Sequence, residues 1–172
     1  MSEVISLTVE ELNGMSREAF TETVGWVFEH SPWVAERAWA QRPFPDSDSL
    51  HLAMARQVEA AKPDEQLALL RAHPDLGTRA ALSDASAAEQ AGAGLDRLSR
   101  EEFERFARLN ENYKSKFGFP FLLAVKNCTK QDVLRELEQR LPSPQEVEFA
   151  EALRQVYRIA AFRLHDVLSK ER

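Results

Sequence analysis

The sequence predicts an all-α protein in which one domain, residues 1–172, contains about eight or nine helices. Three observations predict this class. Apolar residues recur at steps of three and four, which is the spacing of one helix face. Serine or threonine followed three residues later by glutamate, the pattern of a helix N-cap, opens several segments. No stretch of alternating apolar and polar residues is long enough to predict a strand.

The first part of the chain is expected to form five helices, at about residues 8–13, 16–29, 31–39, 50–61 and 64–72. Thr8 and Glu11 have the spacing of a capping box, in which each side chain bonds the other residue's backbone N–H. Ser31 is expected to cap the third helix. Pro32 suits the first turn of that helix because its fixed φ is helical and its missing N–H is not needed there.

The rest of the chain is expected to form helices at about residues 99–117, 129–141 and 143–169, with a further helix that begins at Pro120, while residues 78–94 are alanine-rich. Ser86 with Glu89 and Ser99 with Glu102 have capping-box spacing. The last helix has a cap, a first-turn proline and a capping-box glutamate at its start. Its expected apolar stripe consists of Leu153, Val156, Tyr157, Ala160, Leu164 and Val167.

Residues 109–125, LNENYKSKFGFPFLLAV, place many apolar side chains on a backbone that glycine and proline interrupt. Gly118 is expected to end one helix because glycine adopts positive φ without strain, and Pro120 is expected to begin the next. The first turn of that second helix, around Phe121–Leu123, would present backbone N–H groups without a partner in the helix. Phenylalanines surround this corner. The pattern predicts a pocket for a small planar ligand with negative charge or carbonyl groups. The alternative is a buried corner that binds nothing.

The composition is that of a globular protein and excludes several functions. Hydrophobic residues make up 44% of the chain and charged residues 29%, an ordinary balance for a chain that folds around its own core. The formal net charge of −6 argues against binding to nucleic acid, whose phosphates attract basic surfaces. Without a run of 18 apolar residues, the sequence predicts no membrane span. A single cysteine, Cys128, and no signal peptide lead us to expect a cytoplasmic protein.

Three side chains could carry chemistry, and each has a structural alternative. His73 precedes Pro74 in a turn, and histidine titrates near neutral pH; it could instead bond the last carbonyls of the preceding helix. Glu89 could belong to a site or complete a cap with Ser86. Arg163 flanks the apolar stripe of the last helix. There it pairs with a carboxylate, extends to solvent, or binds an anionic ligand through two nitrogens.

The turn at residues 86–90 is a second candidate clamp for a ligand. Its first backbone N–H groups would lack partners within the helix, and Gln90 adds an amide that both donates and accepts. The spacing of the other histidines, His30, His51 and His165, is not that of metal ligands, and no nucleotide-binding motif is present. We therefore expect a site without a metal ion or another cofactor.

Four segments together resemble the 2-oxo-4-hydroxy-4-carboxy-5-ureidoimidazoline (OHCU) decarboxylase family. They are HPDLG at 73–77, SAAEQ at 86–90, LNENYKSKFGFPFLLAV at 109–125 and RIAAFRLHDVL at 158–168. The stretch FTETVGWVFEHSPWVAERAW at 20–39 is similar to the same family. The resemblance spans almost the whole chain in the family's order, and KFGFPF is a specific motif.

The resemblance implies an all-helical, cofactor-independent enzyme, usually a homodimer, which converts the small molecule OHCU to (S)-allantoin during urate oxidation. The catalytic residues it implies are His73, Glu89 and Arg163, with no metal ion. The substrate-binding positions it implies, largely through backbone groups, are Pro74, Ser86, Ala87, Ala88, Glu89, Gln90, Phe119, Phe121, Leu122, Leu123, Ala124 and Val125.

Two other functions stay open on the sequence. One is a helical binding module that keeps the fold and the pocket but lacks the chemistry. The other is a decarboxylase of a related ureido or imidazoline acid. A module that only binds has no need of His73, whereas a related enzyme would keep Arg163 and differ in the wall of its pocket.

Overall fold

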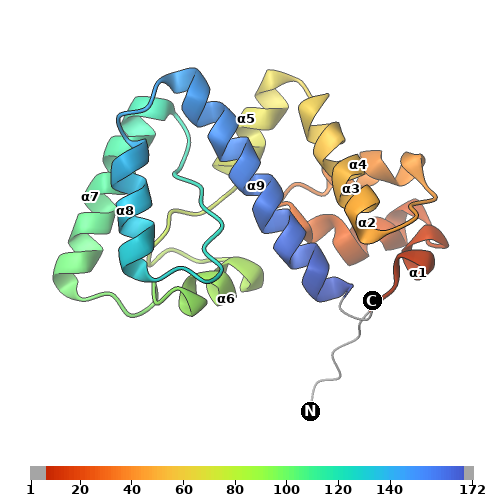
Figure 1. The fold of residues 1–172 in the computed structure, drawn as a ribbon, viewed down its shortest axis with the longest axis horizontal. Helices are drawn as coiled ribbons and strands as arrows, with labels where there is room; N and C mark the ends of the chain where they lie inside the picture. The colour runs from red at the N-terminus through yellow and green to blue at the C-terminus, as the bar shows by residue number, and fades with distance from the viewer. Residues whose placement is uncertain (1–6, 169–172) are drawn as a thin grey trace, which may run out of the picture. The chain divides into compact units, whose positions relative to one another are not determined.

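The computed structural model describes residues 7–168, and this part of the chain contains nine α-helices, two short 3₁₀ helices and no β-strand (Figure 1). The predicted all-α class is therefore confirmed. The described residues form two compact units. One unit runs up to Ala72 and resumes at Tyr157, and the other comprises His73–Val156.

The first unit contains five α-helices, two 3₁₀ helices and the C-terminal part of α9. Its elements are α1 (Val9–Asn13), α2 (Arg17–Val24), η1 (Gly25–Val27), α3 (Trp33–Ala38), η2 (Trp39–Gln41), α4 (Ser47–Glu59), α5 (Pro63–Arg71) and part of α9 (Gln145–Val167). The hydroxyls of Thr8 and Ser16 accept the first-turn N–H groups of α1 and α2, as predicted. Ser31 does not cap α3, because its hydroxyl donates to the carbonyl of Glu29 instead.

The core of the first unit forms where α2, α3 and α4 pack together. The rings of Phe20 and Phe44 stack there with centroids 6.2 Å apart. Fully buried apolar side chains from the three helices are Phe20, Val24, Val34, Ala38, Leu50, Met54 and Val58. The helical spacing of these residues in the sequence reflects this packing.

The second unit consists of α6 (Asp84–Gly92), α7 (Arg100–Phe117), α8 (Lys130–Arg140) and the first part of α9. Ser99 and Thr129 cap α7 and α8 in complete capping boxes. Helix α8 packs beside α7, as Figure 1 shows. Helix α9 ends at Val167, and the predicted end at Ser169 lies outside the described residues.

The predicted helix at Pro120 does not form. Gly118 ends α7 in the left-handed conformation, φ 82°, as predicted, but no helix follows until α8 begins at Lys130. Every residue from 119 to 125 is buried. The carbonyl of Leu122 and the N–H of Ala124, which a helix would bond to its own backbone, bond to the side chains of Arg140 and Gln155 instead. The prediction of a helix N-terminus at Phe121–Leu123 is therefore wrong.

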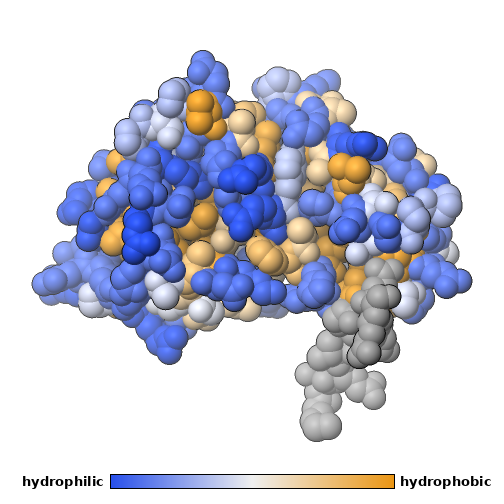
Figure 2. All heavy atoms as spheres, in the orientation of Figure 1, coloured by the Kyte–Doolittle hydropathy of each residue, from blue (hydrophilic) through white to orange (hydrophobic). Residues whose placement is uncertain are grey.

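The molecular surface agrees with the charge-rich composition. On the face drawn in Figure 2, hydrophilic residues cover most of the area and hydrophobic residues are scattered among them. The most exposed large apolar side chains of the described residues are Trp26, Leu52 and Val147. Apolar residues scattered singly over a surface are normal for a folded protein.

Gly77 and Gly94 both have a left-handed backbone, but only Gly77 has other side chains close to the position of a Cβ. Their φ angles are 74° and 78°, but a Cβ at Gly77 would lie 3.0 Å from Leu98 Cδ1 and 3.3 Å from the Phe106 ring, whereas Gly94 has nothing within 4 Å. Gly94→Ala should lower the free energy of unfolding by about 1–2 kcal/mol from the backbone alone. Gly77→Ala should lower it further because side chains must also move. Urea denaturation measures both, and equal losses would contradict the crowding at Gly77.

Candidate active site

The turn that carries His73 is connected to α6 by one side chain. Gln90 accepts the N–H of Gly77 at its Oε1, 3.0 Å away, and donates from its Nε2 to the carbonyl of Asp75, 3.2 Å away. Gln90 is buried, and both ends of its amide bind the turn. The predicted site residue Gln90 therefore joins α6 to the turn at residues 73–77, which begins with His73.

Helix α7 holds the same turn through two more polar contacts. Asn110 Nδ2 donates to the carbonyl of Leu76 at 2.8 Å, and Lys114 Nζ pairs with the carboxylate of Asp75 at 2.8 Å. The hydrogen bond to Asp75 raises the pKa of Lys114 above its ordinary value, so the ammonium group is charged at neutral pH. Three consecutive residues of the turn are thus fixed by side chains from two helices.

The structure places the predicted residues His73, Pro74 and Glu89 in the second unit. The side chain of His73 is buried, with 7% of its surface exposed, while Pro74 and Glu89 are half-buried. Glu89 precedes Gln90 in α6, so the helix that carries the carboxylate is bonded to the turn that carries the imidazole. A histidine shielded from bulk water can exchange protons with a bound molecule in preference to solvent.

The segment at residues 86–90 lies within α6 and is not its start. Helix α6 begins at Asp84 with Ser83 as its N-cap, and Ser83 Oγ accepts the N–H of Ser86 at 3.2 Å. The carbonyl of Ser83 accepts the N–H of Ala87 at 2.8 Å. The predicted capping box of Ser86 with Glu89 is therefore wrong, because Ser83 satisfies the first-turn N–H groups three residues earlier.

The remaining predicted substrate contacts divide into exposed and buried positions. Ala87 and Ala88 are exposed on α6, whereas Phe119 and the residues 121–125 are buried. Within that segment the N–H of Ala124 donates to Gln155 Oε1 at 3.0 Å, and the carbonyl of Leu122 accepts from Arg140 at 2.6 Å. Part of the backbone that the resemblance assigns to the substrate therefore already bonds to side chains of α8 and α9.

Arg163 lies in the first unit and pairs with a carboxylate. Its NH2 group is 3.0 Å from Glu29 Oε2, and its NH1 group donates to the carbonyl of Trp26 at 3.3 Å. Both side chains of the pair are 3% exposed. Of the alternatives that the sequence left open, the structure thus contains the carboxylate pair, which compensates the cost of burying a guanidinium.

Sequence reasoning did not identify Glu29 as a partner of Arg163. The signal available was an acidic residue directly after the apolar pair Val27–Phe28, where a charge is costly unless it is paired. The residue after it, His30, has a positive φ of 45°. The chain thus bends sharply directly after Glu29.

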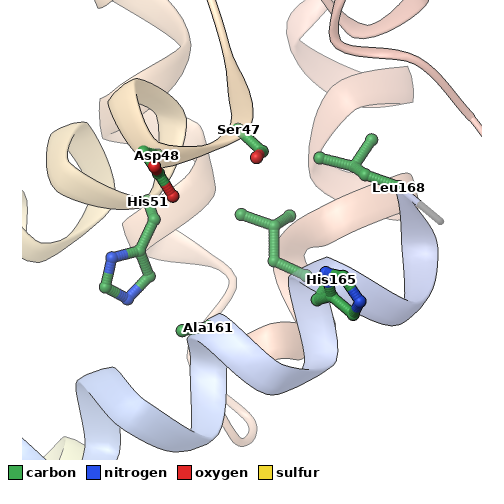
Figure 3. Close-up of a pocket in the computed structure, with 7 residues that line it drawn as sticks. Ser47, Asp48, His51, Ala161, His165 and Leu168 are labelled. Carbon is green, nitrogen blue, oxygen red and sulfur yellow. The ribbon is translucent and has the colours of Figure 1, made fainter. Parts of the chain in front are cut away.

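A small pocket of about 180 Å³ lies within the first unit, and none of the residues that line it is a predicted site residue (Figure 3). Helix α4 contributes His51 on one side and α9 contributes His165 on the other. His51 Nε2 donates to the carbonyl of Tyr157 at 2.8 Å. The residues that line the pocket are Ser47, Asp48, His51, Ala161, Leu164, His165 and Leu168.

The described residues lack two features. Between residues 7 and 168, no group of three or more His, Cys, Asp or Glu side chains could hold a metal ion. In the same range, no helix combines the length and the apolar character that crossing a bilayer requires.

The family model for OHCU decarboxylase matches residues 13–165. The chain belongs to the OHCU decarboxylase family. A 2-oxo-4-hydroxy-4-carboxy-5-ureidoimidazoline decarboxylase of Haloferax volcanii is 48% identical over 165 residues, which is 96% of this chain and 98% of that one. The uric acid degradation bifunctional protein PucL of Bacillus subtilis is 48% identical over 95% of this chain, but the match spans 33% of the length of PucL.

One solved structure has the same fold. It is a crystal structure of (S)-allantoin synthase, with a TM-score of 0.75 and 34% sequence identity. The match covers 94% of this chain and 54% of that one. The family and the fold that the sequence resemblance implied are therefore confirmed.

The buried pair of Arg163 and Glu29 should be sensitive to loss of its charge balance. Glu29→Gln keeps the size of the side chain but leaves the guanidinium without a counter-charge, and breaking a buried pair costs about 3–5 kcal/mol. Glu104→Gln is the control, because Glu104 pairs with Arg100 at an exposed position where little stability is gained. Urea denaturation compares the two variants. A loss for Glu29→Gln no larger than for Glu104→Gln would show that the pair contributes nothing.

Proposed function

We propose that this protein decarboxylates OHCU and releases (S)-allantoin and CO2 in the degradation of urate. The supporting observation is membership of the family along nearly the whole chain, with His73, Glu89 and Arg163 all present in its motifs. One relative is 48% identical to this chain, and the match covers 98% of that relative's length. It bears the name of this decarboxylase.

The reaction breaks one carbon–carbon bond and makes one carbon–hydrogen bond. The carboxylate leaves as CO2, and the electron pair of the broken bond passes into the ring. One proton is then added to one face of the ring, which fixes the configuration of the product. Fixed donors directed at the developing charge supply much of the barrier reduction in such steps, with single donors worth about 3–4 kcal/mol.

We assign the roles of the three residues from this chemistry. Arg163, which pairs with Glu29 in the structure, is also assigned to the anionic substrate, because a guanidinium presents several donors in a fixed planar fork. His73 moves the proton at the 4-hydroxyl or at the new carbon–hydrogen bond, and Glu89 assists it. The rigid turn supports the role of His73, since Gln90, Asn110 and Lys114 fix its next residues.

The phenylalanine rings of the segment belong to the core. Phe119 and Phe121 are each 1% exposed, and their rings pack edge-on against Tyr113, with centroids 5.9 and 5.4 Å apart. The guanidinium of Arg140 also lies over the ring of Phe121. These rings are therefore not available as an apolar wall against the substrate carboxylate. The two helix N-termini expected to bind the substrate are not part of this proposal.

We propose further that the chain acts as a homodimer, without a cofactor, in the cytoplasm, and as one functional domain. The resemblance supports the homodimer and the cofactor-free reaction, and the single cysteine suits a reducing compartment. The family match supports one functional domain, because it continues across the boundary between the two compact units. Sedimentation velocity at micromolar concentration tests the dimer.

The experiment that tests the function follows circular dichroism at an allantoin band while freshly generated OHCU decays. The protein should produce a single-handed signal much faster than the uncatalysed decay. His73→Ala should lower kcat/KM by about 100- to 10,000-fold, the usual contribution of a general acid or base. His165→Ala, which removes an exposed histidine of α9, is the control and should keep full activity.

Two outcomes contradict the proposal. Decay to racemic product at the uncatalysed rate would leave a helical binding module on the same fold. Full activity of His73→Ala would keep the enzyme and remove the histidine from its chemistry.

A further inference from the structure

Three helices of the second unit meet at a buried ion pair that the proposed chemistry does not use. Arg140 of α8 is 7% exposed and Glu148 of α9 is 1% exposed. Arg140 Nε donates to Glu148 Oε1 at 2.6 Å, and its NH2 group also contacts this oxygen. Tyr113 of α7 donates its hydroxyl to the same oxygen at 2.6 Å. Burial raises the pKa of Tyr113, and the hydrogen bond to Glu148 raises it further, so the phenol is neutral.

The third arm of the guanidinium binds the segment that precedes α8. Arg140 NH1 donates to the carbonyl of Leu122 at 2.6 Å. The guanidinium also lies over the ring of Phe121, with its central carbon 4.5 Å from the ring centroid, a distance at which a cation is attracted to the ring face. One side chain therefore fixes both a carbonyl and a ring in two adjacent residues.

A second side chain, Gln155 of α9, fixes the same segment two residues further on. Gln155 is 2% exposed, and its Oε1 accepts the N–H of Ala124 at 3.0 Å. Its Nε2 donates to Glu151 Oε1 at 2.8 Å. Because an ionised carboxylate only accepts, Glu151 determines which end of the amide faces Ala124. The hydrogen bonds from Arg154 lower the pKa of Glu151 and keep it ionised.

Stability alone does not explain the buried pair. Replacing a buried ion pair by apolar side chains of similar volume is often neutral or stabilising, because the pair must be taken out of water. A guanidinium differs from an apolar side chain in having several donors in a rigid planar fork. In this chain the donor that does not face Glu148 faces the carbonyl of Leu122. The distinctive effect of the pair is therefore on the backbone at Leu122.

We propose that Arg140 and Gln155 are positioning residues, which set the backbone of Leu122–Ala124 in the geometry that the substrate requires. The inference rests on the proposed function and on the family resemblance, which assigns residues 121–125 to the binding of OHCU. The segment has no helix or strand to fix its peptide groups. Side chains of α8 and α9 fix these peptide groups instead. Their precision matters because a displacement of about 1 Å in a site can cost about 100-fold in rate.

The first test removes the polar network and keeps the core apolar. The variant Tyr113→Phe/Arg140→Met/Glu148→Leu should stay folded with a cooperative urea transition, while its kcat/KM falls by about 100-fold, mainly through KM. The control Arg105→Met/Glu138→Leu makes the same replacements in a pair between α7 and α8 that is 49% and 41% exposed. This control should keep its activity.

The second test isolates the amide contact and has a readout besides activity. Gln155→Met removes the acceptor of the Ala124 N–H and retains a side chain of similar length. Its amide hydrogen exchange should become faster at residues 121–125 and remain slow in α8 and α9. Its KM should rise at least as much as its kcat falls, because His73 and Glu89 keep their places.

The outcomes separate this inference from the proposed function. Wild-type kcat/KM in either folded variant, with an active wild type, overturns the positioning role and leaves the decarboxylase intact. Equal acceleration of exchange throughout the second unit, with KM unchanged, also overturns it, because the effect would then be general loss of stability. No turnover of OHCU by the wild type overturns the proposed function and this inference with it.

Discussion

The second unit is organised by one constraint, the need to satisfy the polar backbone groups of a buried segment that is not helical. A buried N–H or C=O without a partner costs about 1–3 kcal/mol, and residues 119–125 are all buried. The partners come from side chains that are themselves buried, Arg140 and Gln155. The turn at 73–77 is fixed in the same way, with Gln90 bonded to its backbone. Both parts of the candidate site thus depend on hydrogen bonds from side chains to backbone.

Local sequence signals predicted most of the fold because a helix begins and ends through contacts between near neighbours. Ser99 accepts from Glu102 three residues away, and Gly118 closes the same helix with positive φ, so both signals lie inside a short window. The turn at His73 was predicted for the same reason. The family motifs then identified the chemistry that such local rules do not contain.

Two of the missed features depend on residues far apart in the sequence, whereas the missed cap of α6 is a choice between two nearby serines. Pro120 suits the start of a helix, but side chains distant in the sequence bond the backbone of the segment instead, and no local pattern reports them. Ser83 and Ser86 are equivalent as caps by type, and the structure uses the earlier one. The partner of Arg163 is Glu29, 134 positions away. Spacing rules for a helix or a turn do not reach that distance.

The most direct test of where the site lies is a titration of the ¹⁵N-labelled protein with (S)-allantoin, followed by amide chemical shifts. Our account predicts that the shifts concentrate in the turn at 73–77 and in the segment at 121–125, the two places where side chains fix the backbone. Shifts confined to the pocket beside His51 and His165 would contradict it and place the binding site elsewhere.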